Sequence, residues 1–273
     1  MTLTSAELEQ YRTQGWLAPI DVLSERDALA LAGKLETAER GYPAELHAEN
    51  RNNAHLAFPF LAELAKHPTI ADVVTAIVGA DITLWSTVLF VKEPDSAAFV
   101  SWHQDAFYMG LDPDDFVTAW IALTPSTRQT GCVSVIPGSH SRVHEHQDTF
   151  GADNILTRGQ SVAEVDATKA VHLELQPGQM SLHHPWLIHG SQPNRSSQRR
   201  IGVAMQSYLG ARVHPVRGIH HVMHIRGRPV SAPFVEAPAP ASECSLDAMA
   251  VRAAANNALA DVLYNDAAER RDL

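Results

Sequence analysis

Short apolar segments separated by turns limit the folds that this chain can adopt. Between residues 82 and 209, runs rich in β-branched and aromatic residues alternate with turns that contain Gly or Pro, as in ITLWSTVLFVK (82–92) and FVTAWIAL (116–123). Such residues favour strands, and strands of this length and spacing are typical of a sandwich or jelly roll rather than of βαβ units. We therefore predict a mainly β protein with its jelly-roll core in residues 82–209.

Helical patterns precede this core. Thr4 and Glu7, and then Ser24 and Asp27, have the spacing of residues that cap the first turn of a helix. A third apolar stripe with helical spacing lies just before the first predicted strand. We expect residues 1–80 to be mainly helical and to pack against the outside of a sheet.

The segments between and after the strands are more polar. Residues 141–170 form a long insertion, for which we predict a lid over the site, because loops of this length are usually functional or disordered. Residues 211–228 are rich in Arg and His and suggest a solvated loop, and residues 229–240 suggest an extended Pro/Ala-rich linker. Residues 246–266 have helical periodicity, so we predict a C-terminal extension and helix in residues 210–273.

Composition excludes several classes of protein. A net charge of −10 argues against a surface that binds nucleic acid or anionic membrane. The first residues lack a basic-then-apolar leader, no apolar run approaches ~18 residues, and only Cys132 and Cys244 are present. We therefore expect a cytoplasmic protein with free thiols. The length and apolar content suit one domain, residues 1–273, and the last helix could pack on a second subunit in a homodimer.

An imidazole and a carboxylate two positions apart follow the apolar residues 99–102. His103 and Asp105 would share one face of a strand and could bind one metal ion. A second pair with this spacing, His146 and Asp148, occurs in a polar stretch without apolar periodicity. Because strands hold a ligand pair more rigidly than a surface loop does, we favour the first pair.

Two residues that come much later in the chain, His189 and Arg200, complete a recognisable set. Another apolar run ends at His189, and Arg200 opens the apolar residues 201–205. Two histidines and one carboxylate leave half of the coordination sphere of Fe(II) open, as in non-haem iron oxygenases. The planar guanidinium of Arg200 suits a carboxylate, and its strand should direct it toward the pocket.

These residues belong to a wider set of motifs that resembles the phytanoyl-CoA dioxygenase family of Fe(II)/2-oxoglutarate-dependent oxygenases. The similarity covers residues 55–209. Within the family, LWSTVLFVKEP, VSWHQDAFYMGLDP and LQPGQMSLHH are most similar to a bacterial branch whose members hydroxylate 2-aminoethylphosphonate and similar small polar molecules. The motifs are Phe90-Val91-Lys92-Glu93-Pro94, Trp102-His103-Gln104-Asp105, Ala119-Trp120, Thr130-Gly131-Cys132, Pro137-Gly138-Ser139-His140, Pro177-Gly178, and His189-Gly190-Ser191 through Asn194 to Arg200.

The resemblance implies a double-stranded β-helix, a cupin-like jelly roll with its site at one open end. It also implies that His103, Asp105 and His189 bind Fe(II), with 2-oxoglutarate and O2 as cosubstrates. Halogenases of the family lack the carboxylate, so Asp105 favours hydroxylation. The residues implied to contact 2-oxoglutarate are Arg200, Ser191, Trp120, Lys92 and Val88.

Substrate contacts are predicted from position alone. They would come from side chains just beyond the metal pair, from the insertion and from a polar cluster before the core, for which a solvated loop is the alternative. The predicted residues are Phe107, Tyr108, Met109, Arg51, Asn53 and His55. The neighbouring His183 and His184 are predicted to be structural rather than metal ligands.

The sequence leaves three functions open. The first is hydroxylation of a small polar metabolite, either an aminophosphonate or a natural-product intermediate. The second is a cupin-type metal-binding isomerase or epimerase, and the third is a non-catalytic metabolite-binding relative. Arg200 with Ser191 separates the first from the second, because only a 2-oxoglutarate site needs them, and the intact set of His103, Asp105 and His189 argues against the third.

Overall fold

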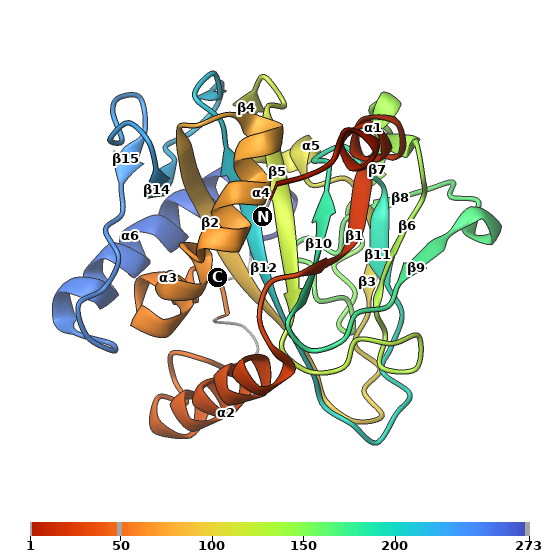
Figure 1. The fold of residues 1–273 in the computed structure, drawn as a ribbon, viewed down its shortest axis with the longest axis horizontal. Coiled ribbons are helices and arrows are strands. Elements are labelled where there is room, and N and C mark those ends of the chain that lie inside the picture. The colour runs from red at the N-terminus through yellow and green to blue at the C-terminus, as the bar shows by residue number, and fades with distance from the viewer. Residues whose placement is uncertain (1, 48–50, 271–273) are drawn as a thin grey trace.

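Two facing sheets form the centre of the computed structural model, which describes residues 2–47 and 51–270 (Figure 1). Apart from the parallel pair β14–β15, the neighbouring strands run antiparallel. The larger sheet has the order β1 (Trp16–Asp21), β10 (Gln179–His183), β5 (Phe116–Ala122), β12 (Arg200–Leu209), β2 (Ile82–Lys92), β14 (His221–Arg226) and β15 (Val235–Glu236). The smaller has the order β3 (Val100–His103), β11 (His189–Ser191), β6 (Val133–Val135) and β9 (Val171–Leu173). The predicted jelly roll is confirmed.

Side chains of the central strands alternate between two buried layers. In β12, Ile201, Val203 and Met205 belong to a large cluster beneath the helices, whereas Ala204 belongs to a second cluster shared with the smaller sheet. Every residue of β5 is buried. Strands covered on both faces need apolar residues at nearly every position, which explains why these segments are continuous apolar runs rather than alternating ones.

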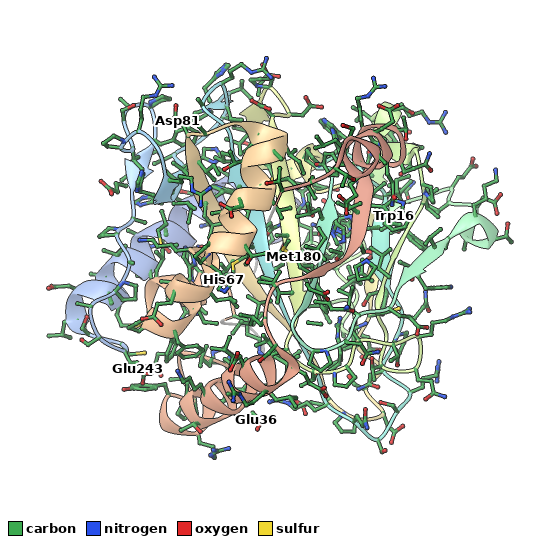
Figure 2. The ribbon with its side chains drawn as sticks, viewed as in Figure 1. Trp16, Glu36, His67, Asp81, Met180 and Glu243 are labelled. Carbon is green, nitrogen blue, oxygen red and sulfur yellow. The ribbon has the colours of Figure 1, made fainter. Side chains whose placement is uncertain are left out.

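Helices cover the outer face of the larger sheet, as Figure 1 shows for α4 in front of β2 and β12. The predicted N-terminal helices are confirmed, and Thr4 and Glu7 form a complete capping box. Met180 of β10, labelled in Figure 2, lies in the buried layer beneath these helices. The helices are α1 (Ser5–Gln14), α2 (Glu25–Gly41), α3 (Pro59–Ala65), α4 (Pro68–Val78), α5 (Ala106–Met109) and α6 (Leu246–Leu263), with short 3-10 turns η1 (Ala54–Leu56), η2 (Ser139–Ser141) and η3 (Ala167–Lys169).

The larger sheet extends beyond the predicted core on both sides. The mainly helical N-terminal part contains β1, which pairs with β10, and its strand pattern is short and interrupted by Pro19. The segment predicted to be a solvated loop contains β14, which pairs with β2 and buries Val222 and Met223. Because residues 221–226 form a paired strand, the interpretation of the whole of residues 211–228 as a solvated loop was wrong.

The insertion (residues 141–170) is anchored to the smaller sheet. It contains the short pair β7 (His146–Gln147) and β8 (Ser161–Val162), and a second short pair joins β13 (His214–Pro215) to β4 (Leu111–Asp112) elsewhere. Backbone bonds join Phe99, just before β3, to Asp153 and Ile155. Of the helices in the described part of the chain, none has the length and apolar character needed to cross a bilayer.

Candidate metal and 2-oxoglutarate site

Three side chains that could bind a metal ion converge at one end of the smaller sheet. His103 ends β3 and lies opposite His189, which begins β11. Asp105 follows β3 by two residues, and its Oδ1 lies 3.3 Å from His103 Nε2 and 3.8 Å from His189 Nε2. One donor atom from each residue lies within 4.8 Å of the others. The sequence-predicted triad is therefore assembled in space.

The imidazoles are oriented by their own backbone. His103 Nδ1 lies 2.9 Å from the carbonyl of Ser101, and His189 Nδ1 lies 2.9 Å from the carbonyl of Leu187. Since a carbonyl only accepts, both Nδ1 atoms carry the proton, and the two Nε2 lone pairs face Asp105. Burial lowers the pKa of His189 to about 4, so its ring is neutral at neutral pH. This is the form that binds a metal.

The carboxylate is fixed by a neighbouring strand. Thr118 of β5 donates a hydrogen bond of 3.2 Å to Asp105 Oδ2, which leaves Oδ1 toward the imidazoles. Burial acts to raise the pKa of Asp105, but the neighbouring imidazoles of His189 and His103 outweigh it, and the net pKa lies below its usual range. The donor set is thus two imidazole nitrogens and one anionic oxygen, which suits Fe(II).

Gln104, between the two ligands in sequence, ties the site to its surroundings. Its side chain is fully buried and donates to the carbonyls of Arg142 and Trp186 at 2.9 and 2.6 Å. Its Oε1 accepts from the backbone of His144 at 2.8 Å. One amide therefore joins the end of β3, the start of the insertion and the loop before β11.

A narrow cavity of about 50 Å³ lies beside the triad and between the two sheets. On β12, alternate positions face it, and Gly202 leaves room for the indole of Trp120, since a Cβ there would lie 1.9 Å from that ring. The guanidinium of Arg200 stacks 5.2 Å from the centre of the same ring. The lining side chains include His103, Asp105, Thr118, Trp120, His183, His189, Ser191, Arg200 and Gln206.

Two buried basic side chains, Arg200 in the wall of this cavity and Lys92 behind it, lack a carboxylate partner among the described residues. Arg200 is 1% exposed, and its Nε has no hydrogen-bond partner in the described part of the chain. Burial lowers the pKa of Arg200 to about 10, so it remains charged at neutral pH. Lys92 lies opposite Arg200 on β2 and donates to the hydroxyl of Ser191, and burial followed by the charge of Arg200 lowers the pKa of Lys92 to about 6. Buried charge without a counter-charge is costly, so the site fits an anionic ligand such as 2-oxoglutarate.

A second, wide cavity of about 750 Å³ opens next to the triad. Phe90, Leu156 and Gln206 line both cavities together with His103 and Asp105. The two cavities therefore meet at the candidate metal ligands, and a molecule in the wide cavity would lie beside a metal ion bound there.

The predicted contact residues divide between these cavities and the protein interior. Tyr108, Met109 and Arg51, three of the residues predicted to contact substrate, line the wide cavity. Val88 also lines the wide cavity and not the narrow one, which differs from its predicted role beside 2-oxoglutarate. Lys92 lines neither cavity and lies behind Ser191.

Three predicted substrate residues lie outside both cavities for structural reasons. His55 is buried and its Nδ1 bonds Thr87 Oγ1 at 2.8 Å, and Asn53 is buried and donates to Asn256 of α6 at 2.9 Å. Phe107 is 38% exposed and stacks 4.3 Å from the ring of His146. Sequence position alone could not separate these residues from Arg51 and Tyr108.

The wall of the wide cavity contains residues that the sequence argument missed. The side chain of Gln206 follows Arg200 on the same face of β12, so the alternation of the strand could have identified it. Leu263 and Tyr264, at the end of α6, also line the cavity. No local pattern indicates them, because they reach the site only through tertiary packing.

The other histidine clusters have structural partners. His183, in the buried layer beside His189, bonds Ser181, and burial lowers its pKa to about 3. Nε2 of His146 accepts the backbone N–H of Gln104, and Asp148 pairs with Arg158. The second His-x-Asp pair is thus engaged elsewhere, in agreement with the choice of the first.

Comparison with known proteins agrees with the family resemblance of the sequence motifs. A family model described as phytanoyl-CoA dioxygenase (PhyH) matches residues 11–202. A probable phytanoyl-CoA dioxygenase of Caenorhabditis elegans is 35% identical over 54% of this chain and 50% of its own length. A probable alpha-ketoglutarate-dependent hypophosphite dioxygenase of Stutzerimonas stutzeri is 32% identical over 61% of this chain and 58% of its own length. The chain thus spans only about half the length of the curated relatives it matches.

A solved structure extends the likeness to nearly the whole chain. The non-heme monooxygenase ThoJ in its apo form has a TM-score of 0.81 and 29% identity, with 92% of this chain and 94% of that one covered. A non-heme alpha ketoglutarate dependent carbocyclase, SnoK, has a TM-score of 0.63 and 25% identity over 78% of this chain and 86% of that one. The likeness in fold to ThoJ therefore covers more of the chain than the residues that the family model matches.

Proposed function

Because this chain belongs to the phytanoyl-CoA dioxygenase family of Fe(II)/2-oxoglutarate-dependent oxygenases, we propose that it is itself a dioxygenase that hydroxylates an unactivated C–H bond of a small molecule. In this reaction one oxygen atom of O2 enters the substrate. The other enters succinate, which is released with CO2 from 2-oxoglutarate.

One observation supports this proposal most strongly. The triad of His103, Asp105 and His189 and the unpaired guanidinium of Arg200 line the same narrow cavity. A metal site without a cosubstrate would not need a buried cation across the cavity. This arrangement therefore favours a 2-oxoglutarate-dependent enzyme over a cupin-type isomerase or epimerase that does not use 2-oxoglutarate, and over a metabolite-binding relative.

Each side chain has a defined task in the proposed reaction. His103, Asp105 and His189 would hold Fe(II), which with 2-oxoglutarate supplies the activation of O2. Arg200 would pair with the distal carboxylate of 2-oxoglutarate, assisted by the hydroxyl of Ser191. Trp120 shields that ion pair from water.

The metal ligands also bear on the reaction type. Asp105 is a carboxylate held in place by Thr118, so a halide would have to displace a fixed anion to bind iron. This supports hydroxylation over halogenation. The protein's remaining part in the reaction is to orient the target C–H bond in the wide cavity.

Substrate, location and assembly are also proposals. The similarity to a hypophosphite dioxygenase favours a small phosphorus-containing molecule such as 2-aminoethylphosphonate. The similarity to a 1-deoxypentalenic acid 11-beta-hydroxylase of Streptomyces arenae, 35% identical over 49% of this chain and 50% of its own length, favours a natural-product intermediate. We further propose a cytoplasmic, single-domain protein, with the exposed start of α6 available for a homodimer.

Anaerobic titration tests the oxygenase proposal directly. Fe(II) and 2-oxoglutarate should produce a visible charge-transfer band with the wild-type chain. Arg200→Met should weaken 2-oxoglutarate binding by about 100-fold, because a buried ion pair is lost, while Fe(II) still binds. Arg26→Met, at a side chain that is 89% exposed on α2, is the matched control. Absence of the band with the wild-type chain would reject the proposal.

A further inference from the structure

The wide cavity is larger than a two-carbon aminophosphonate needs. Its volume is about 750 Å³. Such a phosphonate has about seven non-hydrogen atoms, and even at ~30 Å³ each, the share of one molecule in liquid water, these would fill less than a third of the cavity. A cavity of this size is typical of ligands with several times as many atoms.

The apolar part of the wall around this volume comes from three separate parts of the chain. The inner face of β2 contributes Val88 and Phe90, the insertion contributes Ile155 and Leu156, and the end of α6 contributes Leu263. Polar residues, among them Arg51 and Asn154, complete the wall. The apolar part offers a surface against which burial of an apolar body would be favourable.

A hydrogen-bonding group stands where the cavity meets the triad. Gln206 lines both cavities, and its amide has no hydrogen-bond partner among the residues that the structure describes. An amide both donates and accepts, so it can bind a polar group near the reacting carbon of a ligand. The cavity thus combines an apolar body with a polar inner end.

The wall is held together by Arg158 of the insertion. Its Nη1 donates to the carbonyls of Leu263 and Asn265 at 2.9 and 3.1 Å, and its Nε donates to Asp148 at 2.8 Å. In the opposite direction, the hydroxyl of Tyr264 donates to the carbonyl of Thr157 at 3.1 Å. These reciprocal bonds give the insertion and the end of α6 one fixed geometry, so the volume between them is a defined feature.

From the volume, the wall and Gln206, we propose that the substrate is an amphipathic molecule of about twenty or more non-hydrogen atoms. Its apolar body lies against Ile155, Leu156 and Leu263, and a polar group near its target carbon binds Gln206. The inference rests on the proposed oxygenase function and selects the natural-product class over the aminophosphonate. It also makes the end of α6 a determinant of specificity.

Ligand binding to the Fe(II)- and 2-oxoglutarate-loaded protein, kept anaerobic, tests this. The probe is 8-anilinonaphthalene-1-sulfonate, an amphipathic molecule of the proposed size, and calorimetry measures its affinity and stoichiometry. We expect one molecule per chain, not displaced by 2-aminoethylphosphonate. Leu263→Trp, which fills the cavity, should lower the affinity for the probe at least tenfold. Leu246→Trp, at a 91% exposed position on the same helix, should leave that affinity unchanged.

Three outcomes would overturn the inference. The first is that the probe fails to bind stoichiometrically, and the second is that it binds both variants with equal affinity. The third is that succinate release is coupled to 2-aminoethylphosphonate and not to larger amphipathic acids. Ile155→Trp fills the cavity from the insertion and replaces Leu263→Trp if that variant does not fold. A charge-transfer band without probe binding rejects only the inference, and absence of the band in the wild-type chain rejects the oxygenase itself.

Discussion

Single residues fix the geometry of the site through close contacts. Gln104 connects three segments around the ligands, and Gly202 gives the indole of Trp120 the space to lie under Arg200. Neither residue would take part in the chemistry. Both restrict the positions open to the side chains that would take part, and this restriction fixes the geometry of the site.

At this scale we predict that Gly202→Ala lowers stability by about 1–3 kcal/mol, because the new Cβ overlaps the Trp120 ring. Displacing the indole should also weaken 2-oxoglutarate binding, since Arg200 stacks on it. Denaturant unfolding and anaerobic titration measure the two effects. Gly33→Ala on α2, where a Cβ meets nothing within 4 Å, should be neutral or slightly stabilising. Equal effects of the two substitutions would contradict the steric argument.

At the scale of elements, α6 joins parts of the molecule that are distant in sequence. Arg252 is buried and donates to the carbonyl of Asn52 from Nε and Nη2 at 3.0 and 2.9 Å, and to that of Glu45 from Nη1 at 2.9 Å. Asn256, one turn further on, accepts from Asn53. The helix thereby fixes the segment that carries Arg51 into the wide cavity.

For this element we predict that Arg252→Met lowers stability by about 2–4 kcal/mol, because it removes a buried side chain and leaves partly buried carbonyls without their charged donor. The melting temperature should fall, and ligand binding in the wide cavity should weaken as Arg51 loses its support. Arg26→Met, at an exposed arginine, is the control for loss of charge alone. A melting temperature unchanged from that of the wild-type chain would show that α6 does not anchor this segment.

The sequence predicts the strands, the helices and the triad well, because each has a local pattern. The capping pair Thr4 and Glu7, and the His103/Asp105 pair behind an apolar run, can be identified from spacing alone. In contrast, β1 and β14 owe their strand structure to pairing with β10 and β2, and Leu263 reaches the wide cavity through packing. Such non-local contacts leave no signal in a short window of residues.

At the scale of the whole molecule, buried histidines link stability to pH. His55 is 1% exposed, and burial, followed by the nearby charges of Arg252 and Lys66, lowers its pKa from 6.5 to about 3. The unfolded chain therefore binds a proton that the folded chain excludes. Stability contributed by this group is complete above about pH 6.5 and is lost progressively as the pH falls toward 3.

We therefore predict that unfolding free energy falls on acidification from pH 7 to pH 5, with His55 contributing about 2 kcal/mol of the loss. In His55→Gln the fall should be smaller by that amount. Denaturant titrations at the two pH values measure it, and His214→Gln, at an exposed position, is the control. If the unfolding free energy of His55→Gln changed with pH as much as that of the wild-type chain, the prediction would be contradicted.

The bonds that join the insertion to the residues before β3 have an effect beyond the cavity. β3 is the last strand of the smaller sheet, and the insertion runs alongside it, with hydrogen bonds from Ser101 to Gln160 and between Phe99 and Ile155. Unpaired edge strands are templates for aggregation. The insertion that encloses the wide cavity thus also covers the edge strand β3 and keeps other chains from pairing with it. Shortening the insertion to admit bulkier ligands would therefore lower solubility as well as selectivity.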